Sequence, residues 1–86
     1  MQTFFAKLSA LPVGYSEGHY RGRRYGVTLS VSADGKRRKL FAEELGGIDR
    51  ISFNLYMLAG EKIQLKPCEM PESEVIDFVL AYHPFA

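Results

Sequence analysis

Residues 25–57 read YGVTLSVSADGKRRKLFAEELGGIDRISFNLYM, and apolar side chains occupy every second position on both sides of a turn at 33–35. Alternation with period 2 is typical of a β-strand that has one buried face and one face in water. The Asp34-Gly35 pair is a common hairpin turn, so the neighbouring strands are expected to be antiparallel. The segment predicts three strands, at 25–32, 36–43 and 51–58.

The alternation also assigns side chains to the two faces of this sheet. In the strand after the turn, Leu40 and Ala42 are expected to point inward and Phe41 outward. Residues 39–45 could instead form a short helix ended by Gly46, a residue that readily takes the left-handed conformation of a helix C-terminus. The hairpin turn before them favours the strand.

Two further strands are expected on either side of this segment. Residues 15–21 lead into a tight turn at Gly22-Arg23, which predicts a hairpin with the strand that starts near Tyr25. Residues 62–66 alternate again, and Pro67 ends that strand because proline cannot donate to a sheet ladder. The sheet therefore has five predicted strands.

Helical spacing marks both ends of the chain. Thr3 can cap a first helix that ends near Pro12, and Pro71 suits the first turn of a second one. The expected apolar stripes are Phe4, Phe5, Leu8 and Leu11 in the first helix and Val75, Ile76, Val79, Leu80 and Tyr82 in the second. Residues 1–86 thus predict one α+β domain of order α-β-β-β-β-β-α, with a five-stranded antiparallel meander and both helices on one face.

Composition narrows the class of protein. The chain is 47% hydrophobic and 24% charged, which is the balance of a globular protein rather than a disordered or membrane chain. It lacks an apolar run of the roughly 18 residues that a membrane span requires, and its N-terminus lacks a charged leader with a cleavage motif. Its single cysteine cannot form an internal disulfide. We therefore expect a cytoplasmic protein that does not contact a membrane.

The net charge of +1 conceals a local asymmetry. Seven basic residues lie between positions 21 and 39, against one acid, Asp34. Such a run often only keeps strand ends solvated, and the alternative is a surface that binds anions. The basic residues of this run are Arg21, Arg23, Arg24, Lys36, Arg37, Arg38 and Lys39.

The outward sheet face combines several of these cations with aromatic rings. Basic side chains can hold phosphates while an exposed ring stacks on a base, as in sheets that bind single-stranded nucleic acid. Aromatic residues on a wet face can also mark a protein interface, so a protein partner or a second copy of the chain, forming a homodimer, remains the alternative. The predicted binding residues are Arg21, Arg23, Arg24, Arg37, Lys39, Phe41 and Tyr56.

Cys68 is the candidate catalytic residue. It lies three residues before Pro71, and a thiol near a helix N-terminus can have its thiolate favoured by the dipole. A lone cysteine in a small domain is more often a buried apolar residue, and this is the expectation here. A catalytic dyad of Cys68 and His19 is geometrically possible, although no sequence feature indicates that the two residues meet. The histidines and the cysteine lack the spacing of a metal site, so no metal and no cofactor are expected.

Four stretches, GRRYG at 22–26, KLFAEELGG at 39–47, SFNLY at 52–56 and LKPCEMP at 65–71, resemble a group of small bacterial proteins. Some of these proteins carry the label peptide methionine sulfoxide reductase. The resemblance implies a bacterial origin and a Cys68 that attacks a sulfoxide sulfur to give a sulfenic acid. A sulfoxide pocket also needs an aromatic wall for the methyl group and an acid to protonate the oxygen, roles that Phe53, Tyr56 and Glu69 could fill. The chain lacks the Gly-Cys-Phe-Trp and Arg-x-Cys-x-Asn segments of established reductases, so the noncatalytic interpretation is preferred.

Overall fold

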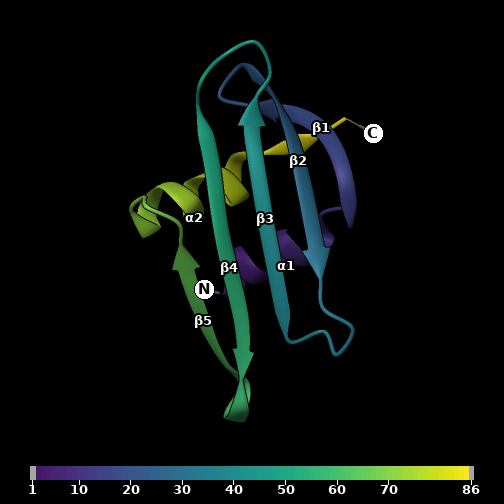
Figure 1. The fold of residues 1–86 in the computed structure, drawn as a ribbon, viewed down its shortest axis with the longest axis vertical. Helices are drawn as coiled ribbons and strands as arrows, with labels where there is room; N and C mark the ends of the chain where they lie inside the picture. The colour runs from purple at the N-terminus through teal and green to yellow at the C-terminus, as the bar shows by residue number, and fades with distance from the viewer. Residues whose placement is uncertain (1, 86) are drawn as a thin grey trace.

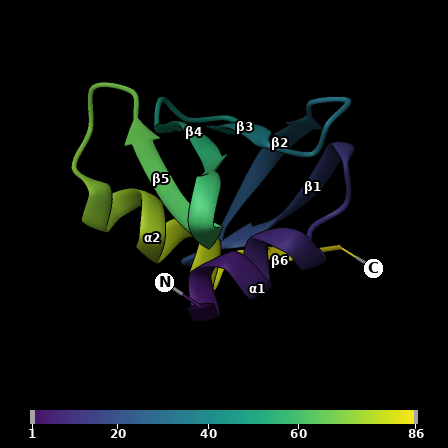
Figure 2. The same ribbon diagram turned by 90° about the horizontal axis from the view of Figure 1, so that it is seen from below.

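An open antiparallel sheet forms one layer of the molecule and two helices form the other (Figures 1 and 2). The computed structural model describes residues 2–85. The strand order across the sheet is β5-β4-β3-β2-β1-β6. The strands are β1 Gly14–Tyr20, β2 Arg23–Val31, β3 Arg37–Glu44, β4 Arg50–Leu58, β5 Lys62–Pro67 and β6 His83–Pro84.

The first five strands form the predicted meander, and the prediction of five strands in all is wrong because β6 adds a sixth. In β6, His83 lies opposite His19 of β1 and Pro84 lies opposite Gly18. The close approach of β6 to β1 depends on Gly18, because a methyl group at this position would overlap the carbonyl oxygen of His83 and lie 2.7 Å from Cα of Pro84. A two-residue strand that contains proline has no periodicity to reveal it in the sequence.

The hairpin turns follow ordinary turn chemistry. Between β1 and β2 the turn residues are Arg21 and Gly22, not Gly22 and Arg23 as predicted, and their φ angles of 51° and 77° are those of a type I′ turn. Between β2 and β3 the Asp34 carboxylate accepts hydrogen bonds from the Ser32 hydroxyl at 2.7 Å and the Lys36 N–H at 2.9 Å. The second turn is therefore closed by its own side chains.

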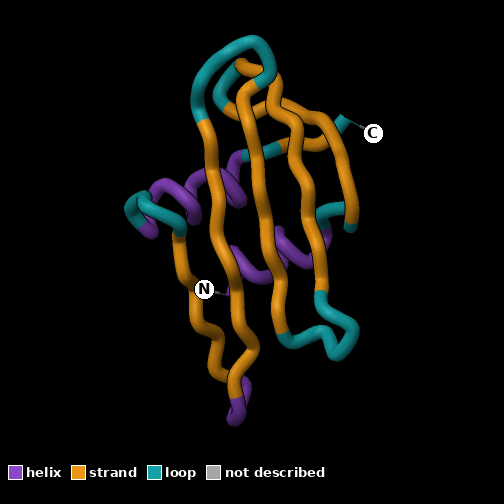
Figure 3. Tube along the Cα trace, in the orientation of Figure 1, coloured by secondary structure: helices purple, strands orange, loops and turns teal. Residues whose placement is uncertain are grey.

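Helices α1, Gln2–Ala10, and α2, Glu72–Ala81, both lie behind the sheet in Figure 3 and below it in Figure 2. Thr3 lies inside α1 and does not cap it, because the helix already begins at Gln2. The predicted stripe of α2 is wrong at Leu80, which is 39% exposed. Phe78 takes the buried position instead, at helical spacing from Val75 and Tyr82.

The core lies between the helices and the inner face of the sheet. The inward positions predicted from alternation are confirmed in β2, β3 and β4, and residues 39–44 form a strand rather than a helix. A short 3-10 turn, η1 Ala59–Glu61, joins β4 to β5. The buried sheet residues are Tyr25, Val27, Leu29, Leu40, Ala42, Ile51, Phe53 and Leu55. Neither helix within residues 2–85 has the length and apolarity needed to cross a membrane.

Candidate functional site

The side of the sheet away from the helices, termed the open face, consists of the outward side chains of β1 to β5 and is turned toward the reader in Figure 1. Strand register places residues of different strands side by side on this face. Ser30, Lys39, Asn54 and Lys66 follow one another across β2, β3, β4 and β5. A row of directly opposed residues has side chains about 5 Å apart, so these four form one continuous polar line.

Two aromatic residues lie on either side of this line. Phe41, which is 37% exposed, lies between Thr28 and Ser52, and the half-buried Tyr56 lies between Arg37 and Gln64. Phe41 is four residues along β3 from Arg37, which is the residue opposite Tyr56. The two rings are therefore separated by about 13 Å along the strand direction.

We call this half of the open face the basic band. Its charged members are all exposed cations. Within residues 2–85, none of these cations forms an ion pair with a described side chain. The polar members add hydroxyl and amide groups between the charges. The basic band consists of Ser30, Arg37, Lys39, Phe41, Asn54, Tyr56, Lys62, Gln64 and Lys66.

The other half of the open face has a different electrostatic character because it contains acids. Glu17 accepts hydrogen bonds from Arg24 Nη2 at 2.8 Å and from the Tyr15 hydroxyl at 3.0 Å. The Arg24 guanidinium also lies 5.8 Å from the centre of the Phe85 ring. Glu43 lies beside Gly26 in the same row as Glu17. The charge of Arg24 is thus neutralised locally, outside the basic band.

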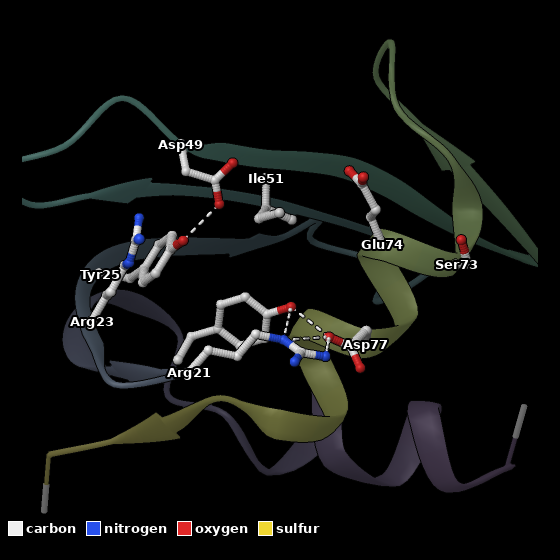
Figure 4. Close-up of a pocket in the computed structure, with 9 residues that line it drawn as sticks. Arg21, Arg23, Tyr25, Asp49, Ile51, Ser73, Glu74 and Asp77 are labelled. Atoms are coloured by element: carbon white, nitrogen blue, oxygen red, sulfur yellow. Dashed lines mark hydrogen bonds and ion pairs between the residues drawn. The ribbon is translucent and has the colours of Figure 1, made fainter.

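Arg21 and Arg23 lie away from the open face, at a cavity of about 550 Å³ between the β1–β2 turn, the start of β4 and the first turns of α2 (Figure 4). The structure therefore brings together four of the seven predicted binding residues and separates the other three from them. Sequence analysis did not single out this cavity. Its lining residues are Tyr20, Arg21, Arg23, Tyr25, Asp49, Ile51, Ser73, Glu74 and Asp77.

Hydrogen bonds tie the two arginines and the two tyrosines of the cavity to carboxylates. Asp77 accepts hydrogen bonds from the Tyr20 hydroxyl and from Arg21 Nη2, the latter at 2.6 Å. These bonds, with that of Tyr20 the stronger influence, hold the pKa of Asp77 below its usual value. Arg23 Nη1 lies 3.2 Å from Glu44 Oε2. Such long-range pairs leave no signal in the sequence.

On the third wall of the cavity, the Tyr25 hydroxyl donates a hydrogen bond to Asp49 Oδ2 at 2.6 Å. Burial, aided by this bond, raises the pKa of Tyr25 above its ordinary value. Tyr25 therefore remains a neutral hydrogen-bond donor throughout the physiological range.

The structure exposes Cys68, so the expectation that it is buried is wrong. Its N–H donates to the Ser52 carbonyl at 3.0 Å, which places it just beyond the end of β5 and not in the lining of the cavity. Phe53 is fully buried in the core and so cannot serve as a wall for a substrate beside this thiol. His19, in β1, lies on the opposite side of the sheet order from β5, so the two residues do not form a dyad.

Comparison with protein-family models, with curated proteins and with solved structures finds no match to this chain. Its function must therefore be inferred from its own residues.

Proposed function

We propose that this chain is a binding module for single-stranded nucleic acid and that the basic band is its contact surface. The observation that supports this proposal is the position of Phe41 and Tyr56 among exposed cations that lack ion-pair partners within the described side chains. Cations attract the phosphates, and aromatic rings on the surface of a sheet offer stacking platforms to bases. A site for a simple anion would require the cations but neither aromatic ring, so the rings favour nucleic acid as the ligand.

The geometry favours single strands over duplexes. Stacking on a protein ring requires a base that is free of its own neighbours, and a duplex does not offer one. The separation of about 13 Å between the two rings exceeds the spacing of adjacent nucleotides, so one nucleotide is expected to lie between the two stacked bases. Asn54, half-buried in the middle of the polar line, faces that intervening base.

Fluorescence anisotropy of labelled ten-nucleotide oligouridine and oligothymidine at low salt tests the proposal. Each ring removed by Phe41→Ala or Tyr56→Ala should cost about 1–3 kcal/mol of binding free energy, since stacking has that value per base. The matched control is Tyr15→Ala, because Tyr15 is 61% exposed on the same face but lies beside Glu17, outside the basic band.

Two results would contradict the proposal. One is the absence of binding by the parent protein at low salt, and the other is a loss of affinity in the control that equals the loss in the two band variants. If the parent protein instead forms a dimer by light scattering and the same two variants are monomeric, the open face is an interface between copies of the chain.

A further inference from the structure

The polar line of the basic band presents its hydrogen-bonding groups in an order that the strand register sets. Lys39 lies directly opposite Asn54 on one side, and Lys66 lies directly opposite Asn54 on the other. Neighbouring strands are about 4.8 Å apart, so the amide of Asn54 has a lysine on each side of it. Both lysines are exposed and Asn54 is half-buried. Because a lysine side chain extends further from the sheet than an asparagine side chain does, both ammonium groups reach a ligand that contacts the amide.

The protein itself leaves these three side chains without partners. Among residues 2–85, no side-chain hydrogen bond or ion pair engages Lys39, Asn54 or Lys66. A lysine ammonium has three N–H donors and no acceptor, whereas the asparagine amide has a carbonyl acceptor and an NH₂ donor. With the amide oxygen turned toward the ligand, the line reads donor, acceptor, donor across β3, β4 and β5.

The bases of nucleic acids differ in how well their Watson–Crick edge matches this order. Uracil and thymine present a carbonyl oxygen on each side of a ring N–H, which reads acceptor, donor, acceptor and complements the line at all three positions. Adenine, cytosine and guanine each carry an exocyclic amino group on this edge. An amino group is a donor, and it would face an ammonium that cannot accept a hydrogen bond. Each of these three bases therefore leaves one donor mismatched.

We propose that Asn54 selects uracil or thymine as the base between the two stacked bases. The ring N3–H of that base donates to the amide oxygen of Asn54, and its two carbonyl oxygens accept from Lys39 and Lys66. This inference rests on the proposed function, because it assigns the identity of the base that lies between Phe41 and Tyr56. Each ammonium keeps two further N–H donors, so both lysines remain available to the phosphates.

An NMR titration of the full chain at low salt with the trinucleotides ApUpA, ApCpA, ApGpA and ApApA tests this inference. A trinucleotide covers both rings only with its central base over the polar line, which fixes its register. We expect ApUpA to bind about tenfold tighter than the other three, since a matched set of hydrogen bonds to a base discriminates by about this factor. Methylation of the central uracil at N3 removes the donor and keeps both carbonyl groups, so this probe should bind no tighter than ApCpA. Pseudouridine presents the same three groups as uridine and is the matched control, which should bind as tightly as ApUpA.

A pair of variants tests the role of the amide. Asn54→Leu removes the amide at nearly constant size and should reduce the preference for ApUpA over ApCpA to less than about twofold. Gln64→Leu is the control, because Gln64 carries an amide on the same face but lies opposite Tyr56, outside the polar line. This variant should keep the tenfold preference. If Asn54→Leu does not fold, the N3-methylated probe examines the same hydrogen bond in the parent protein.

Equal affinity of the four trinucleotides would overturn this inference alone and leave the two rings as stacking platforms. Binding of the N3-methylated probe as tight as that of ApUpA would do the same, as would a preference for uracil that persists in Asn54→Leu. If neither the trinucleotides nor oligouridine bind, the proposed function is overturned together with the inference. The deoxy probe d(ApTpA) distinguishes the two kinds of strand, because the tighter of d(ApTpA) and ApUpA identifies the nucleic acid that this face prefers.

Discussion

Salt should weaken nucleic-acid binding by an amount that follows from the charges in the basic band. Four exposed cations face the ligand there: Arg37, Lys39, Lys62 and Lys66. Each phosphate contact with a single strand contributes about −0.7 to the slope of log K against log salt, so four contacts predict a slope of about −2.8. Raising the salt from 50 to 200 mM should then lower the affinity about 50-fold.

Lys39 and Lys66 lie at two positions of the same polar line and can be replaced by glutamine, singly and together. Each change of lysine to glutamine should reduce the steepness of the slope by about 0.7, and the double variant should retain a slope of about −1.4. Its affinity should fall only about sevenfold over the same range of salt. Glutamine keeps a polar side chain of similar length, so the sheet itself is not expected to change.

The assay is fluorescence anisotropy of a labelled oligouridine at four or more salt concentrations. Lys7→Gln is the control, because Lys7 lies on α1 in the other layer of the molecule and should leave the slope unchanged. If the double variant keeps the parental slope, phosphates do not lie along the basic band and the proposed contact surface is wrong. If Lys7→Gln flattens the slope as much as Lys39→Gln does, the attraction arises from net charge alone.

Three further predictions concern the contact between β1 and β6, the carboxylate of Asp77 and the thiol of Cys68. Gly18→Ala should destabilise the protein by about 2–3 kcal/mol in urea unfolding, because the added methyl group meets the backbone of β6. In Gly26→Ala the nearest atoms belong to the side chain of Tyr15, which is 61% exposed and can turn into solvent, so this control should change stability by less than about 1 kcal/mol. The pKa of Asp77 is lowered in the folded state, so its contribution to stability is present above the unfolded pKa of 3.8 and is lost as the pH falls through the folded value. The urea midpoint of Asp77→Asn should accordingly depend less on pH than that of the parent protein between roughly pH 5 and pH 2. An equal dependence of the two midpoints on pH in this range would contradict the prediction. The exposed Cys68 should react with a thiol reagent about as fast in the folded protein as in urea. With dithiothreitol as the reductant, the protein should reduce methionine sulfoxide no faster than a protein-free blank does. Reductase activity that Cys68→Ser abolishes would refute the noncatalytic interpretation.

The features of this fold that could be predicted from the sequence are those set by local periodicity. Alternation alone places Phe41, Lys39 and Arg37 on the face opposite Leu40 and Ala42, because a one-residue shift would bury charges and expose the core. The predictions failed where a distant partner decides the outcome. Strand β6 forms because a glycine in β1 leaves room for it. Phe78 replaces the predicted Leu80 in the core because three tyrosine rings surround it, at centroid distances between 4.7 and 5.3 Å.

The basic run between positions 21 and 39 shows why charge in the sequence is a poor measure of charge on a surface. The hairpins send its members in three directions. Arg21 and Arg23 meet carboxylates at the cavity, Arg38 lies inward with its guanidinium 5.2 Å from the centre of the Phe5 ring, and only Arg37 and Lys39 remain free on the basic band. Two of the band's four cations come instead from β5, more than twenty residues away in the sequence. A ligand that stacks on Phe41 and Tyr56 would therefore have cations on both sides of its path, Arg37 and Lys39 on β3 and Lys62 and Lys66 on β5.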